Sequence, residues 1–402
     1  MTCSPNHALR GMLATALTLL AGAPALAGVL PDDRADVLYH RYDGGGVRID
    51  GPSVLVRKKF LDKFSVSANY YVDMVSSASI DVITTASPYR ERRTQTSGSI
   101  DYLLGKSTYT LGYIDSSESD YQAKTAYFGV SQDLFGDLTT VSFGFKRGRN
   151  DVFRNIKDPR TGAQVRDPTF RDDVQTRTYS LGLTQVLTRE LLGSFAFDVI
   201  TDEGFLNSPY RTVRFLVAGL AGTPSAVVAR DPERYPLTRT SNAGAVGLKY
   251  FLPYRAAVDG NYRFYTDTWG VTAHTARLGY TQPAWKHWIF DADYRYYRQT
   301  AADFYRDLFA RRNELNFQAR DKELAAFQSH TIGLGATFEF TVPRVPRIAK
   351  ASVNFRFDRM MIRYDDFRDE RASLIARTAS PGGEPLYRLD ANIFQLFFSA
   401  WY

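Results

Sequence analysis

Apolar and polar residues alternate along nearly the whole chain after residue 27. In residues 64–74 every second side chain is apolar, and serine, asparagine, tyrosine and aspartate occupy the positions between them. Residues 288–298 and 330–340 repeat this pattern. Successive side chains of a β-strand point to opposite faces, so the alternation predicts strands with one apolar and one polar face.

The alternation predicts sixteen strands, and most are longer than the roughly five to six residues of an average strand. A soluble β-sandwich also alternates, with its apolar faces turned toward a shared core, so strand length and connections must decide between the two architectures. The predicted strands are 35–43, 47–60, 63–77, 92–105, 107–116, 122–134, 138–149, 176–188, 191–203, 241–252, 256–267, 272–283, 286–300, 329–341, 349–364 and 391–402.

The connections differ in length according to their order. Those after even-numbered strands are short, namely 60–63, 105–106, 135–138, 188–191, 252–255, 283–286 and 341–350. Those after odd-numbered strands include the long segments 78–91, 150–175, 204–240, 301–328 and 365–390, although 44–46, 117–121 and 268–271 are short. This asymmetry is typical of outer-membrane barrels. We therefore predict an all-β fold, a transmembrane antiparallel up-and-down β-barrel with short periplasmic turns and long extracellular loops.

The last predicted strand has the pattern that a closed membrane sheet needs. No water reaches the hydrocarbon layer, so every backbone polar group must pair within the protein and the last strand must find the first. An alternating final strand that ends on an aromatic residue resembles the signal by which the barrel-assembly machinery of Gram-negative bacteria recognises its clients. Its positions here are Phe394, Leu396, Phe398, Ala400 and Tyr402. This machinery and outer-membrane lipid are the expected partners.

Aromatic residues gather near the predicted periplasmic strand ends. Rings with a polar edge favour the interface between headgroups and hydrocarbon, so this placement predicts an interfacial girdle. The alternative is that these residues are ordinary core aromatics. They are Trp285, Trp288, Tyr250, Phe251, Phe64, Trp401 and Tyr402.

The first residues predict export. Arg10 precedes a short apolar run, and residues 25–27 form a small-x-small cleavage site, so residues 1–27 are a predicted signal peptide and 28–402 a single barrel domain in the cell outer membrane. A membrane anchor is the alternative, but the run is shorter than the roughly 20 residues that a spanning helix needs. Cys3 is the only cysteine, which excludes disulfides and thiolate chemistry from the exported chain. Acidic and basic residues interleave, which indicates no nucleic-acid partner.

Two long connections have patterns of their own. Residues 204–240 contain an apolar run, 213–222, that ends at a Gly-Thr-Pro turn signal. This run is either a short helix that constricts the barrel mouth or a strand of an extracellular hairpin. Residues 301–328 have apolar side chains at helical spacing among charges, which predicts a helical outer loop.

The polar faces of the strands carry charges of both signs. A charge that faces lipid at the bilayer midplane costs about 2–4 kcal/mol for Arg or Lys, so charges on a consistent face are expected to point into the lumen. They form either the wall of a pore, with a transverse field that sets its selectivity, or salt-bridge networks that fill the lumen. The candidates are Asp73, Asp101, Lys146, Asp198, Lys249, Asp259, Arg263, Arg277, Asp291, Asp293, Arg295, Glu339, Arg356 and Asp358.

Few other residues suggest chemistry. The four histidines of residues 28–402 have no metal-ligand spacing, although a Ser–His hydrolase could draw its residues from different strands. Asp115, Glu118 and Asp120 share one tight connection and either bind Ca²⁺ or, as we favour, form a solvated turn. We predict no catalytic residue, no metal and no cofactor.

Two segments, YDGGGVRIDGPSVLVRK (42–58) and SVSANYYVDMVSSASIDV (65–82), resemble the bacterial family catalogued as domain of unknown function 3570. The resemblance extends over nearly all of residues 28–402 and implies an outer-membrane barrel. Genes of this family are associated with those of a small lipoprotein, a thioredoxin-like protein and a flavin-transferring enzyme, which hints at envelope redox chemistry or flavin transport. The resemblance implies no site residues.

These observations predict a porin-like channel that passes a solute across the outer membrane. A non-conducting barrel that serves as a scaffold for a periplasmic redox, flavin-linked or lipoprotein partner is the main alternative. A barrel-borne envelope hydrolase is the third, and we expect that the protein is not an enzyme.

Overall fold

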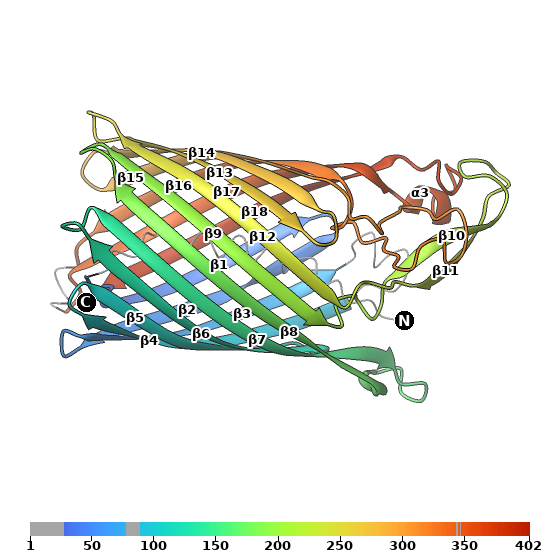
Figure 1. Cartoon of the computed structure of the whole chain (residues 1–402), viewed down its shortest axis with the longest axis horizontal. Coiled ribbons are helices and arrows are strands. Elements are labelled where there is room, and N and C mark those ends of the chain that lie inside the picture. Colours follow the sequence, from blue (N-terminus) through green and yellow to red (C-terminus); the bar gives the residue numbers. More distant parts are fainter. Residues whose placement is uncertain (1–27, 78–88, 343–344, 346) are drawn as a thin grey trace.

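Sixteen strands form one closed antiparallel barrel (Figure 1). The structure, a computed structural model, describes residues 28–77, 89–342, 345 and 347–402, so the predicted signal peptide lies outside the described residues. Strands that are adjacent in the sequence pair with each other, and β9 pairs with β12. β18 (Leu386–Trp401) closes the sheet by pairing with β1 (Arg34–Gly44) along the full length of β1.

The other barrel strands follow the predicted order. All sixteen predicted strands are present, and most of their ends agree within three residues. The strands are β2 (Val47–Phe60), β3 (Phe64–Ser77), β4 (Tyr89–Leu104), β5 (Ser107–Ser117), β6 (Tyr121–Leu134), β7 (Thr139–Lys157), β8 (Gln164–Val186), β9 (Leu191–Gly204), β12 (Thr238–Phe251), β13 (Ala257–Asp267), β14 (Thr272–Ala284), β15 (Trp288–Gln299), β16 (Phe327–Phe340) and β17 (Lys350–Arg368).

Two strands extend far beyond the prediction. β7 ends at Lys157 and β8 begins at Gln164, so most of the predicted loop 150–175 is instead a paired hairpin. Outside the membrane both faces of a hairpin meet water, so the alternation that marks the spanning strands is lost there. The hairpin projects beyond the barrel rim (Figure 1).

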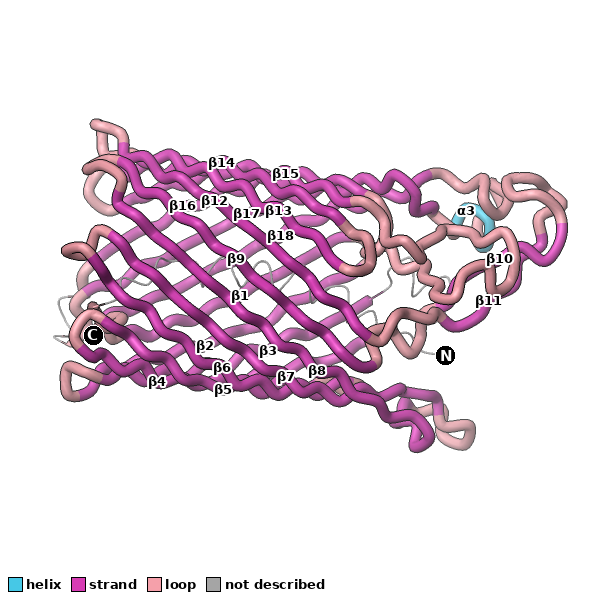
Figure 2. Tube along the Cα trace, viewed as in Figure 1, coloured by secondary structure: helices cyan, strands magenta, loops and turns pink. Residues whose placement is uncertain are grey.

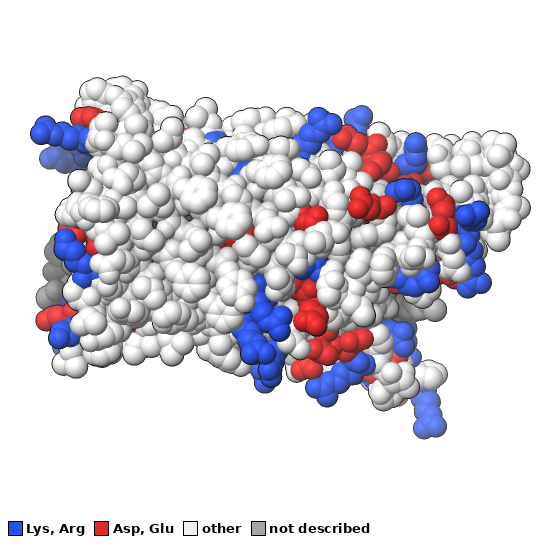
Figure 3. Space-filling view, viewed as in Figure 1, with Lys and Arg blue, Asp and Glu red and all other residues white. Residues whose placement is uncertain are grey.

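The face of the barrel seen in Figure 3 carries almost no charge along its middle, and many large apolar side chains of the barrel strands are exposed. Such an extensive apolar surface is not suited to water, whereas a closed sheet leaves no backbone group unpaired in lipid. The predicted transmembrane β-barrel is therefore confirmed. Exposed side chains of this band include Val54, Leu111, Phe143, Leu181, Leu248, Leu278 and Leu334.

The two ends of the barrel differ as predicted: one carries short turns and the other long loops (Figure 2). At the periplasmic end Trp285 is 81% exposed, and Trp288, Tyr250, Phe251 and Tyr402 are exposed as well. The alternative that these rings belong to a core is therefore wrong for these five residues.

Three extracellular segments fold together, and we call residues 205–237, 300–326 and 369–385 the cap. Residues 205–237 contain a hairpin of β10 (Thr212–Ala218) and β11 (Val227–Pro232), so the strand alternative for the run 213–222 is correct and the helix alternative is wrong. The hairpin lies beyond the ends of the barrel strands (Figure 1). α3 (Arg371–Leu374) belongs to the third segment, and no helix of the described residues is long and apolar enough to cross a membrane.

The prediction of a helical loop over 301–328 is wrong. The segment has an irregular backbone, and several of its amides bond to other parts of the cap. Phe309 N–H donates to Arg214 O at 3.0 Å, and Leu216 N–H donates to Phe309 O at 3.0 Å. Its aromatic side chains pack against the cap and the inner barrel wall, and this tertiary packing overrides the helical spacing.

The largest hydrophobic core lies inside the extracellular end of the barrel. It joins inner side chains of β1, β2, β17 and β18 to the cap segment 300–326, so the cap is anchored in the mouth by apolar packing. Its buried members are Tyr42, Val47, Ile49, Tyr235, Trp269, Val271, Ala302, Phe304, Tyr305, Ala319, Leu324, Ala325, Phe327, Met360, Ile362, Tyr364, Phe367, Tyr387, Leu389 and Ala391.

Candidate functional site

The strand register places the charged candidates on the inner wall. Asp293 of β15 pairs with Gly279 and Gly333, whereas the next residue, Tyr294, pairs with Leu278 and Ile332 of the exposed apolar face. The same alternation holds along the other strands. The inner face thus includes Asp73, Asp101, Lys146, Asp198, Lys249, Asp259, Arg263, Arg277, Asp291, Asp293, Arg295, Glu339, Arg356 and Asp358.

Five of these residues form a ladder of alternating charge across β13, β14, β15 and β17. Arg277 lies 3.1 Å from Asp259 and 3.5 Å from Asp293. Arg356 lies 2.7 Å from Asp293 and 2.6 Å from Asp358. The ladder crosses β16 above Gly333, where an added Cβ would lie 2.4 Å from the Arg356 guanidinium. The missing side chain therefore lets the ion pairs of β15 and β17 meet.

Other inner charges have different partners. Asp101, Asp198 and Asp291 each accept a hydrogen bond from a threonine or serine hydroxyl of the neighbouring strand. Glu339 pairs with Lys350 at 2.5 Å. Four inner cations have no carboxylate within 4 Å among the described residues, namely Lys146, Lys249, Arg263 and Arg295.

The inner wall is in contact with solvent-accessible space. The side chains of Arg277, Asp259 and Arg356 are 29%, 27% and 28% exposed, although all three point away from the outer surface. Side chains of a filled lumen would be buried. The interior therefore is not packed solid beside the ladder.

A buried polar group lies on the inner side of β1 and β3. His40 Nε2 is 2.8 Å from Asp73 Oδ1 and 3.1 Å from the Tyr71 hydroxyl, and the rings of His40 and Tyr71 stack. A hydrolase of the Ser–His type would also need a serine hydroxyl against a histidine. Over the described ranges, no serine hydroxyl bonds to a histidine, and His274 and His330 instead bond to tyrosines of the outer face.

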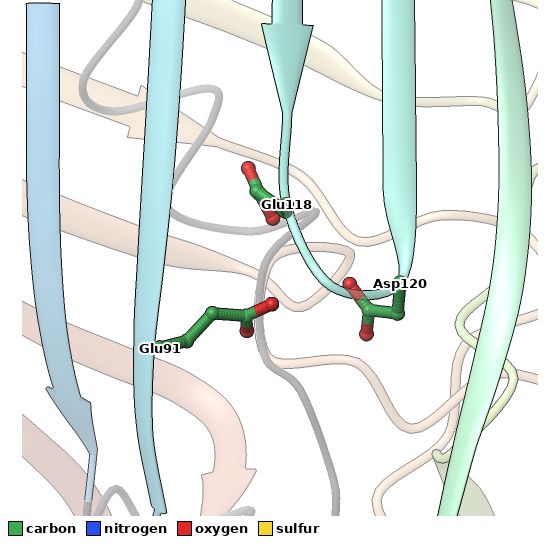
Figure 4. Close-up of side chains that lie close together, drawn as sticks. All are labelled: Glu91, Glu118 and Asp120. Carbon is green, nitrogen blue, oxygen red and sulfur yellow. The ribbon is translucent and has the colours of Figure 1, made fainter. Parts of the chain in front are cut away.

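Three carboxylates come together near the β5–β6 turn (Figure 4). They are Glu118, Asp120 and Glu91, and one oxygen of each lies within 4.8 Å of the others. The predicted set was wrong in Asp115, which faces outward on β5 opposite Lys124. Glu118 and Asp120 are buried, so the alternative of a solvated turn is wrong for them.

The carboxylates of this cluster already have protein partners. Ser119 donates its amide and hydroxyl to Glu91, and Tyr210 donates its hydroxyl to Asp120 at 2.9 Å. Arg93 Nε lies 3.7 Å from Glu118. The cluster thus joins β4, the β5–β6 turn and the cap segment 205–237, and we assign it no ion.

A buried ion network holds the three cap segments together. Arg214 of β10 is 1% exposed and lies 2.5 Å from Glu384, which is fully buried. Arg214 also pairs with Asp307, and Arg320 lies 3.1 Å from both Asp307 and Glu370. Each segment of the cap therefore contributes at least one charge, and a cavity of about 280 Å³ lies beside Arg214 and Glu370.

The charges of this network support one another. Burial disfavours the charged form of Arg214, but Asp307, Glu384 and Glu370 outweigh burial and raise its pKa. Burial would raise the pKa of Glu384, but the hydrogen bond and charge of Arg214 outweigh burial and lower it. No pattern in the sequence indicates this network, because Arg214 and Glu384 are 170 residues apart in different connections.

Asp366 makes the cap pH-dependent. It lies where β17 extends into the cap, and burial, aided by Asp307 and Asp365, raises its pKa to about 6 from an ordinary 3.8. A raised carboxyl pKa means that the folded cap takes up a proton before the unfolded chain does, so stability grows as the pH falls from about 6 to about 4.

We expect Asp366→Asn to stabilise the cap by about 1 kcal/mol at pH 7, allowing for solvent screening of this partly exposed group. The substitution should also remove the difference between pH 5 and pH 7. Hydrogen exchange at the Ala326 amide, which donates to Asp366 at 2.9 Å, measures both effects once intrinsic rates are corrected. A pH difference that persists in the variant would contradict this assignment.

Solved structures with similar folds are outer-membrane proteins. One is described as a bacterial polysaccharide outer membrane secretin, with 7% identity, a TM-score of 0.46, and coverage of 92% of this chain and 98% of that one. A Pseudomonas aeruginosa FadL homologue has 10% identity, a TM-score of 0.39, and coverage of 94% and 92%. The CymD monoaromatic hydrocarbon channel has 8% identity, a TM-score of 0.41, and coverage of 100% and 94%.

No curated protein matches this chain. A family model matches residues 79–363, so most of the two segments that carried the resemblance lie before the matched region. The matched region contains the strands from β4 to most of β17, and with them the whole charge ladder. The chain belongs to the family described as protein of unknown function (DUF3570).

Proposed function

We propose that this protein conducts a solute across the outer membrane through the barrel lumen and that the cap controls entry from outside. The observation that carries the proposal is the solvent-exposed charge on the inner wall, at Arg277, Asp259 and Arg356. A barrel of sixteen strands is wide enough to enclose an aqueous channel. Charged side chains in that space favour water or a charged solute over a dry core.

The arrangement of the charges supports a selective pathway. The ladder pairs its two arginines with three aspartates, so most of its charge is compensated along one side of the lumen. Arg263 on β13 and Arg295 on β15, with β14 between them, have no carboxylate within 4 Å in the described part of the chain. Asp101 and Asp291 accept hydrogen bonds from threonine hydroxyls instead of forming ion pairs. These residues would set which sign of solute passes.

The cap supports controlled rather than constant passage. Its apolar core packs inside the extracellular end of the barrel against β1, β2, β17 and β18, and its ion network joins all three segments. The wild-type pore is therefore expected to open rarely, and the pore of a variant with a destabilised cap is expected to open more often.

The test is the reversal potential of single channels in a planar bilayer under a salt gradient. Arg263→Gln/Arg295→Gln should shift the potential toward cation selectivity, and Asp101→Asn/Asp291→Asn should shift it toward anion selectivity. The matched control is Arg359→Gln/Arg363→Gln, because both arginines lie on the outer face and pair with Asp390. This control should leave the potential unchanged.

The cap variant Arg214→Met distinguishes a closed channel from a scaffold. Single-channel current steps in the variant but not in the wild type would support a channel that the cap closes. Silence of both folded proteins would contradict the proposal and favour the non-conducting scaffold for a periplasmic partner. Single-channel currents whose reversal potential does not change when the inner charges are substituted would also contradict the proposal.

A further inference from the structure

A cluster of basic residues lies on the outer surface of the barrel, over β6, β7 and β8 (Figure 3). It consists of Lys124, Arg147, Arg149 and Arg177, which we call the basic patch. Lys124, Arg147 and Arg149 are exposed, and Arg177 is partly exposed. The patch therefore faces the membrane side of the wall and takes no part in the lumen.

The register fixes the height of the patch. Phe145 and Tyr179 form a cross-strand pair of the outer apolar band, with ring centroids 5.1 Å apart. Arg147 and Arg177 form the next outward-facing pair toward the extracellular side. Outward-facing pairs are two residues apart, or roughly 7 Å. The patch thus begins where the apolar band ends, at the level of the lipid headgroups.

The patch brings like charges together. Arg147 lies directly opposite Arg177, and Lys124 lies directly opposite Arg149. Like charges opposite each other in an antiparallel pair are destabilising. Two such pairs lie in adjacent rows, so an anion between them would stabilise this face of the barrel.

The protein supplies only part of the counter-charge. Glu203 lies 3.6 Å from Arg177, and Asp115 faces outward on β5 opposite Lys124. Lys124, Arg147 and Arg149 have no carboxylate within 4 Å in the part of the chain that the structure describes. The opposite side of the barrel differs. There the outward arginines Arg359 and Arg363 both pair with Asp390, at 3.0 Å and 2.6 Å.

We infer that the basic patch binds the phosphate groups of a phosphorylated glycolipid in the outer leaflet. Phosphate oxygens accept charge-assisted hydrogen bonds from guanidinium groups, which suits three arginines and one lysine. Three neighbouring strands span roughly 10 Å, which fits one or two phosphate groups rather than a long polyanion. Such a lipid would neutralise both like-charge pairs and fix the height of the barrel in the membrane.

The experiment uses the full-length gene product extracted from membranes in mild detergent. Native mass spectrometry counts the lipid bound after addition of bisphosphorylated lipid A, dephosphorylated lipid A, phosphatidylglycerol or inorganic phosphate. Arg147→Gln/Arg149→Gln should bind bisphosphorylated lipid A about 30-fold more weakly. Each basic residue near an anionic membrane surface contributes about 1 kcal/mol of binding free energy, and the loss of two such residues corresponds to this change in affinity. The wild type should prefer this lipid to the other three probes.

The matched control is Arg359→Gln/Arg363→Gln, which removes two outward arginines that already have a carboxylate. It should bind lipid A as tightly as the wild type does. The second control, Arg147→Lys/Arg149→Lys, keeps both positive charges and should keep most of the affinity, which excludes loss of folding as the cause of weaker binding. The inference would be overturned if Arg147→Gln/Arg149→Gln bound bisphosphorylated lipid A as tightly as the wild type does, or if the control lost as much affinity as that variant. It would also be overturned if the wild type bound dephosphorylated lipid A as tightly as bisphosphorylated lipid A. Equal binding of phosphatidylglycerol or inorganic phosphate, or a polypeptide in place of lipid, would overturn it as well.

Discussion

Arg214→Met should destabilise the cap by about 3–5 kcal/mol, because it leaves Glu384 and Asp307 as buried carboxylates without their main counter-charge. Methionine keeps much of the side-chain length, so the effect comes from the charge rather than from a cavity. The amides of Leu216 and Phe309, which bond the hairpin to segment 300–326, should exchange about 150- to 5000-fold faster. Single-channel openings should become more frequent.

Arg312→Gln is the matched control for this result. Arg312 joins the same two segments through Asp231 at 2.7 Å, but it is exposed. An exposed ion pair contributes only about 0–1 kcal/mol, so exchange at Leu216 and Phe309 should change little. Equal acceleration in both variants would show that burial of the network does not matter, and no acceleration in Arg214→Met would show that apolar packing alone holds the cap.

Gly51→Ala should destabilise the barrel by about 3 kcal/mol or prevent its assembly. An added Cβ would lie 1.8 Å from the carbonyl oxygen of Val72 on β3. That atom belongs to the backbone and cannot rotate away, so β2 and β3 must separate beside the buried His40–Asp73 pair. The temperature at which the folded barrel loses its faster gel migration measures the effect.

Gly260→Ala provides the comparison for Gly51→Ala. It lies on β13, and an added Cβ would meet no atom within 4 Å. Alanine also reduces the freedom of the unfolded chain, so this variant should be as stable as the wild type or slightly more stable. A large loss of stability in Gly260→Ala, or none in Gly51→Ala, would contradict the assignment of the effect to the approach of β2 and β3.

The membrane-spanning part of the fold could be predicted because its cause is local. Lipid outside and water inside impose alternation on every spanning strand. An apolar residue then marks the lipid face of the strand, and the polar residue beside it marks the lumen face. That logic located the inner charges, including both arginines of the ladder. It failed for the β7–β8 hairpin, because water on both sides removes the alternation.

The cap could not be predicted because its partners are distant in the sequence. Arg214, Asp307 and Glu384 come from three different connections, and no periodicity marks which charges will meet. The apolar side chains of 301–328 had helical spacing, yet they pack on the barrel wall and on β10. Glu91 was missed for the same reason, since it reaches Glu118 and Asp120 from a different strand.

The sharing of carboxylates within the cap has a consequence for how the mouth can open. Arg214 and Arg320 share Asp307, and both lie within 4 Å of Glu370, so no segment can leave without stranding a buried charge of another. Partial opening therefore carries nearly the full energetic cost of complete opening. We therefore expect the proposed opening of the cap to occur as one cooperative step between two states rather than through a graded aperture.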